Sequence, residues 1–208
     1  MHGFLALGDS YTIGEAVGEH DRWPVQLVAR LRALGVTLDD PQIIATTGWT
    51  TDELSAAMDR SHFDPPYALV TLMIGVNNQY RGRDLHEYAE QFDALLARAI
   101  HLAGDDATRV IVLSIPDWGA TPFGQASGRD LATIAAQIDA FNASAQAGTR
   151  VRGAAWVDVT PVSREVAHDA SLAAHDGLHP SPSMYAKWVD LVLPAAQMRL
   201  QKDMAATR

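Results

Sequence analysis

The chain has 208 residues, of which 48% are apolar, and it carries a formal net charge of −9. A chain of this length can bury a substantial core in one domain, and its acidic balance argues against a nucleic-acid partner. Because it contains no cysteine, disulfides and thiolate metal sites are excluded.

The sequence predicts no membrane or targeting segment. No apolar run approaches the roughly 18 residues that a membrane-spanning helix needs, so we expect no membrane partner. The opening segment MHGFLALGDS lacks a basic region and a cleavage site, and it is typical of a first strand. We therefore expect a cytoplasmic protein from the chain as it stands, or a periplasmic or secreted one if a leader has been removed.

Apolar runs alternate with amphipathic stretches along the chain, which predicts alternating strands and helices. In chain order these are a strand at 4–7, a helix at 22–35, a strand at 42–45, a helix from 51, a strand at 67–75, a helix at 84–104, a strand at 109–116, a helix at 128–148, a strand at 154–159 and a helix at 181–200. Thr50 and Glu53 have the spacing of a capping box before the second helix. Ser181 is the expected N-cap of the last helix, with Pro182 at its first position.

This alternation predicts a parallel sheet covered by helices on both faces. With right-handed crossovers, the architecture is a three-layer α/β/α sandwich. No repeat or linker divides the chain, so we expect a single domain over residues 1–208.

Glycine and polar residues follow the first four predicted strands. They are Gly8-Asp9-Ser10, Thr47-Gly48-Trp49, Gly75-Val76-Asn77-Asn78 and Asp117-Trp118-Gly119, and the motif Asp176-Gly177-Leu178-His179-Pro180 stands near the chain end. The carboxyl ends of parallel strands open at one edge of a sheet, where ligands bind. All five motifs should therefore gather at one rim.

These motifs contain the groups that nucleophilic acyl transfer needs. Ser10 supplies a hydroxyl, and Asp176 and His179 share one short turn that can aim the carboxylate at the imidazole. Gly48 lets a backbone N–H approach a substrate closely, and Asn77 offers a side-chain amide to a developing oxyanion. Taken one by one, such motifs are more often ordinary turns or helix starts, and it is their occurrence together at the strand ends that favours catalysis.

In this order the blocks resemble those of the SGNH (GDSL) hydrolase family, an esterase and lipase-like family, over almost the whole chain. The resemblance implies a flavodoxin-like sheet in the order 2-1-3-4-5. It also implies that Ser10 is the nucleophile, His179 the base and Asp176 the residue that orients the base. The backbone N–H groups of Ser10 and Gly48 and the amide of Asn77 would form the oxyanion hole.

Two positions depart from the family pattern. Tyr11 follows the serine where the motif has leucine, which we expect to be tolerated because that side chain takes no part in the reaction. Asn78 stands where many relatives have aspartate, so the hydrogen bonds around the oxyanion hole should differ. The chain also differs from the larger α/β-hydrolases, a separate class, in which the nucleophile lies in a G-x-S-x-G elbow. Here Thr12 stands where that elbow has its second glycine.

The expected activity is therefore that of a serine esterase acting on a small ester, with no cofactor. The same triad would serve a thioesterase, a lysophospholipase or a carbohydrate acetylesterase. A remote alternative is a metal-dependent hydrolase that uses His175, Asp176 and His179 as ligands. A binding module of flavodoxin type is less favoured, because the chain has no glycine-rich phosphate loop or Walker motif.

Two tryptophans are candidate walls of the acyl pocket. Trp49 and Trp118 lie beside rim motifs, and packing in the core is the alternative role for both. Because the connecting loops are short, we expect a shallow pocket that favours acyl groups of roughly C2 to C6.

Gln79 and Arg81 follow Asn77 closely and are candidate contacts for the polar part of the substrate. An arginine there would favour polar or anionic esters. The alternative for Arg81 is a surface ion pair with Asp84 or Glu87 at the start of the next helix.

Overall fold

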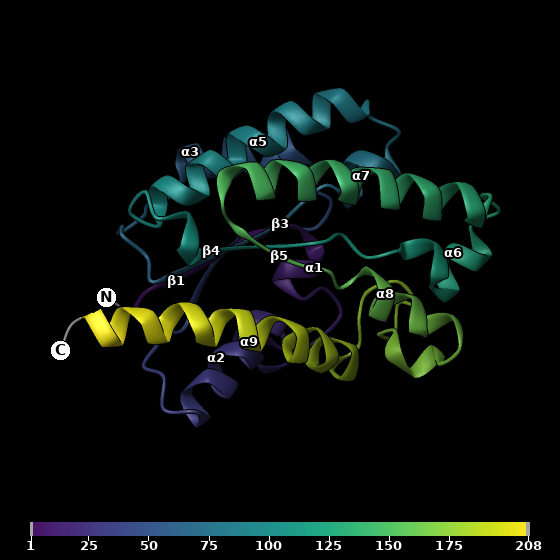
Figure 1. Cartoon of the computed structure of the whole chain (residues 1–208). Helices are drawn as coiled ribbons and strands as arrows, with labels where there is room; N and C mark the ends of the chain where they lie inside the picture. Colours follow the sequence, from purple (N-terminus) through teal and green to yellow (C-terminus); the bar gives the residue numbers. More distant parts are fainter. Residues whose placement is uncertain (1, 207–208) are drawn as a thin grey trace.

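The computed structural model describes residues 2–206 and contains a five-stranded parallel sheet between two layers of helices (Figure 1). The strands are β1 (Phe4–Gly8), β2 (Pro41–Ala45), β3 (Leu69–Met73), β4 (Val110–Leu113) and β5 (Ala155–Val157). Their order is β2-β1-β3-β4-β5, which confirms the predicted sheet.

The register of the three strands β1, β2 and β3 brings their carboxyl ends level. Gly8, the last residue of β1, pairs with Ala45 of β2 on one side and with Met73 of β3 on the other. Each of these residues ends its strand. The segments that begin at Ser10, Thr46 and Gly75 therefore leave the sheet at one edge.

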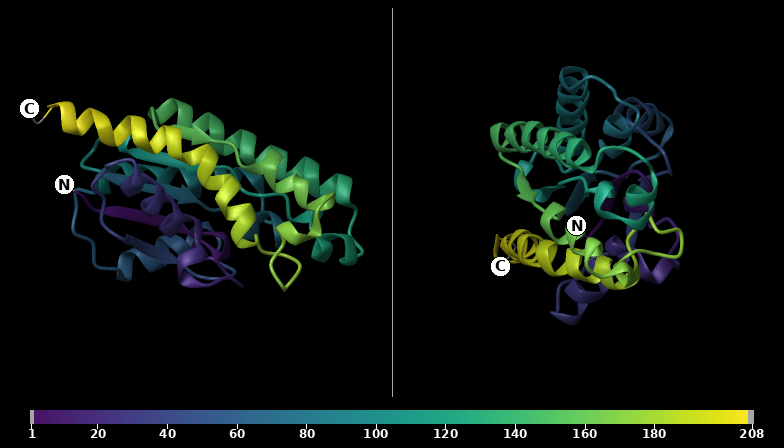
Figure 2. Two further views of the ribbon diagram at one scale, coloured as in Figure 1. Left: turned by 90° about the horizontal axis from the view of Figure 1, so that it is seen from below. Right: turned by 90° about the vertical axis from the view of Figure 1, so that its right-hand side faces the viewer.

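Five longer helices cover the two faces of the sheet. Helices α2 (Trp23–Ala33) and α9 (Pro182–Ala206) lie on one face, and α3 (Thr51–Arg60), α5 (Leu85–Leu102) and α7 (Leu131–Arg152) lie on the other (Figure 1). The start of β1 and the end of α9 lie at the same end of the molecule (Figure 1; Figure 2, left).

Short helices and single turns fill the connections. The short helices are α1 (Ser10–Ile13), α4 (Val76–Tyr80), α6 (Pro122–Ala126) and α8 (Thr160–Ser163). The 3₁₀ turns are η1 (Glu19–Asp21), η2 (Ala107–Arg109), η3 (Trp118–Ala120), η4 (Arg164–Ala167) and η5 (Ala170–Leu172). Both α1 and α4 begin within three residues of a strand end, so they carry Ser10 and Asn77 directly at the edge of the sheet.

The central strands form the core. Every residue of β1 and β3 is buried, as expected for a parallel strand covered on both faces. Trp23 of α2 and Trp188 of α9 are fully buried beneath one face, and Tyr88 of α5 is buried beneath the other. Burial of one large apolar side chain stabilises the fold by roughly 1.5–3 kcal/mol, so this core holds the edge of the sheet rigidly.

Several element boundaries differ from the predicted ones. Helix α7 was expected at 128–148, but Asp130 caps it by accepting a hydrogen bond from the amide of Ala132, and it continues to Arg152. Gly148 does not end it, because its φ is not positive; Gly153, with a φ of 77° in the left-handed region, does. Strand β5 stops at Val157 and not at residue 159, since the amide of Val159 donates to the Ser114 hydroxyl and leaves the ladder.

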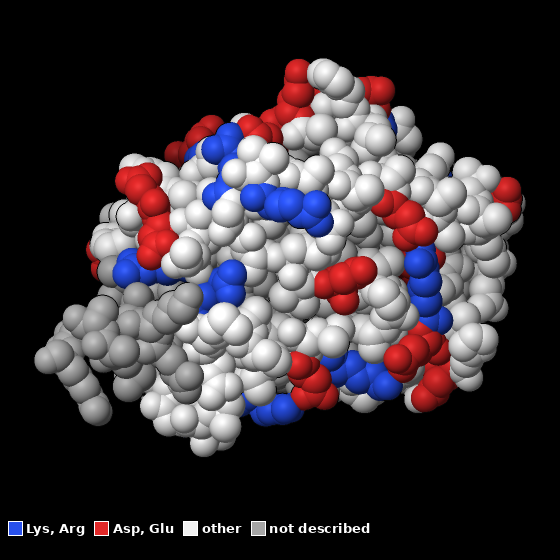
Figure 3. Space-filling model, in the orientation of Figure 1, with Lys and Arg blue, Asp and Glu red and all other residues white. Residues whose placement is uncertain are grey.

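Acidic side chains pair with basic ones on the surface. On the face drawn in Figure 3, basic and acidic side chains are interspersed. Some of these basic and acidic side chains form ion pairs, for example Arg30 with Asp190 and Lys187 with Glu165. Among the described residues, no helix combines the length and the apolar character required to cross a membrane.

Candidate active site

Ser10 is held where β1 turns directly into α1. Asp9 caps this helix, because its Oδ1 accepts a hydrogen bond of 3.0 Å from the amide of Tyr11. The turn is tight: a Cβ on Gly8 would lie 2.1 Å from Oγ1 of Thr12. Only glycine fits at this position, and the turn leaves Ser10 nearly buried, with 4% of its surface exposed.

Asp176 and His179 are joined in a single turn before α9. Oδ2 of Asp176 lies 2.6 Å from Nδ1 of His179, while its Oδ1 accepts hydrogen bonds from the amides of Leu178 and His179. Gly177 permits the turn with a φ of 69°. Because Nδ1 is engaged with the carboxylate, Nε2 is the ring nitrogen left for a partner in the cavity.

Packing and charge hold the imidazole in place. The ring of Tyr11 packs against that of His179 with centroids 5.1 Å apart, and Trp188 stacks behind Tyr11. Partial burial alone would raise the pKa of Asp176, but hydrogen bonds from the His179 ring and from two backbone amides outweigh burial and lower it below its ordinary value of 3.8. Asp176 is therefore a carboxylate at neutral pH and stabilises a positive charge on His179.

The turn that contains Gly48 lies beside α4. Gly48 has a φ of 86°, in the region that favours glycine. The side-chain amide of Asn77 donates a hydrogen bond of 2.9 Å to the carbonyl of Trp49. One of its two N–H bonds is used in this way, so the other can point to an oxyanion.

The contacts of Asn78 explain why asparagine, and not the aspartate of the family motif, suits this position. It is fully buried, and its carbonyl accepts a hydrogen bond of 3.1 Å from the amide of Thr51. Its NH₂ donates to Oγ1 of Thr51 at 2.7 Å, while that hydroxyl itself donates to Oε1 of Gln91. Since the hydroxyl proton is already engaged, position 78 must supply a donor as well as an acceptor, which an amide does and a carboxylate does not.

A cavity of about 190 Å³ brings four of the predicted groups together. Ser10, Gly48, Asn77 and His179 all line it, and Asp176 lies behind His179. The remaining lining is mostly apolar: Tyr11, Thr47, Val76, Tyr80, Trp118, Phe123 and Leu178. A serine, an imidazole and two possible oxyanion donors around an apolar space can carry out acyl transfer.

The four predicted substrate contacts are placed differently. Trp118 lines the cavity, whereas Trp49, Gln79 and Arg81 do not. Trp49 is partly buried and packs against the core. Gln79 is buried, accepts a hydrogen bond of 2.7 Å from Nε1 of Trp118 and donates to Gln137.

Arg81 has protein partners other than the predicted Asp84 and Glu87. Its guanidinium donates to the carbonyl of Gly48 and lies 3.4 Å from the carboxylate of Glu53. Asp84 instead caps α5. The alternative of an ion pair was thus correct in kind, but wrong in the partner.

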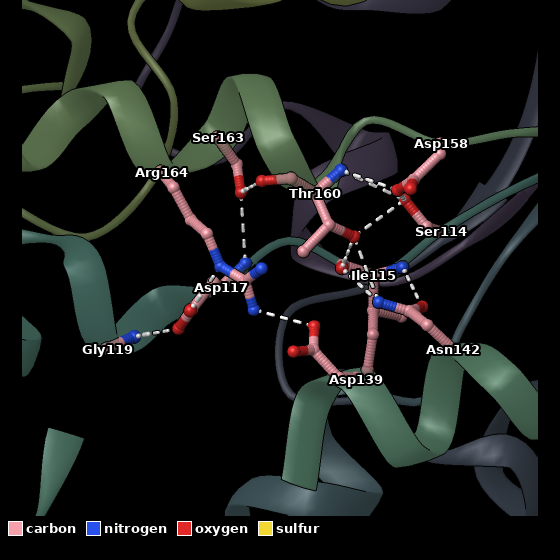
Figure 4. Close-up of polar contacts among 10 residues, drawn as sticks. All are labelled: Ser114, Ile115, Asp117, Gly119, Asp139, Asn142, Asp158, Thr160, Ser163 and Arg164. Atoms are coloured by element: carbon pink, nitrogen blue, oxygen red, sulfur yellow. Dashed lines mark hydrogen bonds and ion pairs between the residues drawn. The ribbon is translucent and has the colours of Figure 1, made fainter. Parts of the chain in front are cut away.

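A polar network holds the loop that carries Trp118 (Figure 4). The buried carboxylate of Asp117 accepts a hydrogen bond of 2.8 Å from Arg164, which also donates to Asp139 on α7. The amide of Asp117 donates to the hydroxyl of Ser163. The wall of the cavity is therefore tied to both α7 and α8.

Asp9 is a feature that the sequence analysis missed. Complete burial raises its pKa from 3.8 to about 7, although the hydrogen bond from the Tyr11 amide opposes this effect. Its Oδ2 has no hydrogen-bond partner within the part of the chain that the structure describes. The available signal was its position between a wholly apolar strand and Ser10, which indicates burial.

The alternative metal site is not assembled. His175 and Asp176 are exposed, whereas His179 is buried. Among the side chains that the structure describes, no three histidine or acidic groups lie closely enough together to hold a metal ion. Asp176 and His179 are in contact with each other, but His175 does not join them in a three-ligand group.

Comparison with known families agrees with this geometry. The model of the GDSL-like Lipase/Acylhydrolase family matches residues 6–187. A comparison with curated protein sequences finds no match.

Solved structures of similar fold cover nearly the whole chain. A lipase/acylhydrolase from Enterococcus faecalis is 21% identical with a TM-score of 0.71, covering 96% of this chain and 97% of that one. TesA is 18% identical with a TM-score of 0.69, covering 95% and 99%. The acetylxylan esterase Axe2 from Geobacillus stearothermophilus is 19% identical with a TM-score of 0.67, covering 96% and 94%. At these identities the likeness establishes the fold alone.

Proposed function

Because the chain belongs to the GDSL-like lipase/acylhydrolase family and is a carboxylic ester hydrolase, we propose that it cleaves short-chain or polar esters through an acyl-Ser10 intermediate. The observation that carries this proposal is the 2.6 Å contact between Asp176 and Nδ1 of His179, with His179 and Ser10 on the wall of one cavity. This arrangement leaves Nε2 of His179 available as a base.

In the proposed acylation step, the oxygen of Ser10 bonds to the ester carbonyl carbon while its proton passes to Nε2 of His179. The tetrahedral intermediate then collapses, and the departing alcohol takes that proton. In deacylation, water adds to the acyl carbonyl and gives a proton to His179, which returns it to Ser10. One ester and one water yield one acid and one alcohol.

The developing oxyanion would be stabilised by the backbone N–H groups of Ser10 and Gly48 and by the Asn77 amide. All three residues line the cavity. Asp176 stays ionised throughout and stabilises the imidazolium.

Labelling with a fluorophosphonate tests this assignment. We expect a single adduct on the peptide that contains Ser10, and Ser10→Ala should abolish both the adduct and ester hydrolysis. Ser114 and Ser163 are matched buried serines whose hydroxyls bond to the backbone or to neighbouring side chains, so they should stay unlabelled. An adduct on either of them, or labelling that persists in Ser10→Ala, would overturn the proposal.

The size of the cavity supports small acyl groups. Its volume of about 190 Å³ is below the roughly 300 Å³ at which pockets for drug-sized ligands begin, so we expect acyl groups of roughly C2 to C6.

An acetylated carbohydrate is the second candidate substrate. The exposed aromatic rings of Tyr80 and Phe123 line the cavity and could stack on a sugar. A solved structure of similar fold is also named as an acetylxylan esterase. Thioesters suit the same acyl-transfer chemistry. A panel of acetyl to palmitoyl aryl esters, acetylated xylose and acyl thioesters distinguishes these substrates, and a preference for palmitoyl would contradict the short-acyl proposal.

A further inference from the structure

We propose that Arg81 is a positioning residue for the oxyanion hole, because its guanidinium holds the backbone turn that presents the Gly48 N–H. The inference rests on the proposed function above, in which that N–H meets the oxyanion. It gives Arg81 a role through Gly48 and not through the substrate.

The first observation is the direct contact. Nη2 of Arg81 donates a hydrogen bond of 2.5 Å to the carbonyl of Gly48. The amide of Trp49, in the same peptide unit, donates to the carbonyl of Thr46. The peptide between Gly48 and Trp49 is therefore held on both its oxygen and its nitrogen, which restricts rotation of Gly48.

The second observation is that Arg81 and Asn77 act on consecutive carbonyls. Asn77 binds the carbonyl of Trp49 at 2.9 Å, and Arg81, four residues later on the same helical segment, binds that of Gly48. The amide of Arg81 donates to the carbonyl of Asn77 at 3.0 Å, which sets the two side chains one turn apart. The element that carries one oxyanion donor thus also fixes the turn that carries another.

The third observation concerns Glu53, which connects Arg81 to Thr50, the N-cap residue of α3 that follows the turn. Its Oε2 lies 3.4 Å from Nη1 of Arg81 and also accepts hydrogen bonds of 2.9 Å from the amide and the hydroxyl of Thr50. The hydrogen bond from the Thr50 amide is the main cause that lowers the pKa of Glu53, and the positive charge of Arg81 adds to it. Glu53 is therefore ionised and supports Arg81 at neutral pH.

The backbone of this turn needs such external contacts. Gly48 has a φ of 86° and no side chain, and the atom nearest to a Cβ built there is Nη2 of Arg81 at 3.5 Å. An oxyanion donor is effective only if it is held in position before the reaction. Arg81 is about two-fifths exposed, so its removal should disturb folding little while the Gly48 N–H loses its orientation.

The experiment compares Arg81→Gln and Arg81→Lys with Arg83→Gln as the matched control. Arg83 is the next basic residue along the chain and also pairs with an acidic residue of α3, Asp52 at 2.7 Å, but it donates to no carbonyl of the turn. For each protein we would measure kcat and KM on a neutral butyrate ester and on a carboxylate-bearing analogue. We would also measure the affinity for an alkyl trifluoromethyl ketone, which adds to the serine and forms an oxyanion. The melting temperature of each variant reports on its folding.

We expect Arg81→Gln to lower kcat by about 10-fold to 100-fold on both esters, with little change in KM and a melting temperature near that of the wild type. Ketone affinity should fall in parallel. Arg81→Lys should recover part of the loss, because an ammonium can also donate to the Gly48 carbonyl, and Arg83→Gln should stay within about twofold of the wild type.

Two results would overturn the inference. One is a kcat and a ketone affinity of Arg81→Gln that stay within twofold of the wild type. The other is a loss confined to the anionic ester, which would make Arg81 a substrate contact. Failure of the proposed function is distinguishable, because the wild type itself would then show no Ser10 adduct.

Discussion

Nε1 of Trp118 donates a hydrogen bond of 2.7 Å to Oε1 of Gln79, which ties the cavity wall to the helix that carries Asn77. Both side chains are buried. The NH₂ group of Gln79 donates to Oε1 of Gln137 at 2.8 Å. The oxygen and the NH₂ of the Gln79 amide therefore join α4 to the loop after β4 and to α7.

Gln79→Met tests this structural role. The substitution keeps the length of the side chain but leaves the Trp118 N–H buried without an acceptor, so we expect the free energy of unfolding to fall by about 1–3 kcal/mol. Urea unfolding at pH 7 measures it. Gln125→Met is the control: Gln125 is exposed and its side chain makes only a long contact of 3.5 Å with the carbonyl of Ala120, so its loss should cost less than about 0.5 kcal/mol. Equal costs for the two variants would contradict the argument.

Asp176→Asn should impair catalysis much more than folding. An asparagine removes the charge that stabilises the imidazolium and can impose the wrong tautomer on His179, so we expect kcat to fall by on the order of 10²–10⁴. Steady-state kinetics and circular dichroism measure the two effects. His175→Ala is the control, since His175 is an exposed neighbour of Asp176, and it should keep wild-type activity with or without a chelator. A loss of activity in His175→Ala that added metal restores would instead favour the metal alternative.

The sequence predicted the sheet order and the residues that gather at the cavity, but not the side chains that support them. Continuous apolar runs made β1 and β3 evident, and the glycine and polar motifs after them marked the edge of the sheet. Asn78 and Arg81 bind Thr51 and Gly48, which lie about thirty positions earlier in the chain. Such pairings depend on how distant segments are packed, and local periodicity carries no information about them.

Asn78→Asp, which introduces the aspartate of the family motif at this position, should destabilise this protein. The Thr51 hydroxyl already donates to Gln91, so a carboxylate at position 78 would lose its donor contact while remaining fully buried. We expect a cost of about 1–3 kcal/mol at pH 8. The cost should shrink at pH 5, because a protonated carboxyl can donate to Thr51. A variant as stable as the wild type at pH 8 would show that the network adapts.

Asp9 should make stability depend on pH. Its pKa is about 7 in the folded chain, against the ordinary 3.8 expected when it is unfolded. Between these pH values the folded chain holds a proton that the unfolded chain has released, so the free energy of unfolding falls as pH rises from 4 to 7, by on the order of 4 kcal/mol from this group. Asp176 acts in the opposite sense, because its lowered pKa removes stability only as pH falls below ~4.

Asp9→Asn is the variant that isolates this effect. Asparagine also caps helices, so the hydrogen bond from the Tyr11 amide can remain. We expect a smaller fall in the free energy of unfolding between pH 4 and pH 7 than in the wild type, measured by urea unfolding at closely spaced pH values. Identical slopes in the two proteins would mean that Asp9 is ionised in the folded chain.

Phe123→Ala should shift the enzyme toward longer acyl groups. Phe123 lines the cavity, is 38% exposed, and lies on the short helix α6, so its removal opens the space at little cost to folding. We expect the ratio of kcat/KM for octanoyl over butyryl esters to rise by about 10-fold, since each extra methylene that finds apolar contact is worth about 1 kcal/mol or more. Leu131→Ala is the matched control, because Leu131 is 40% exposed at the start of α7 but does not line the cavity. A rise in both variants would point to a general loosening of the fold, and a rise in neither would mean that the acyl chain leaves the cavity on another side.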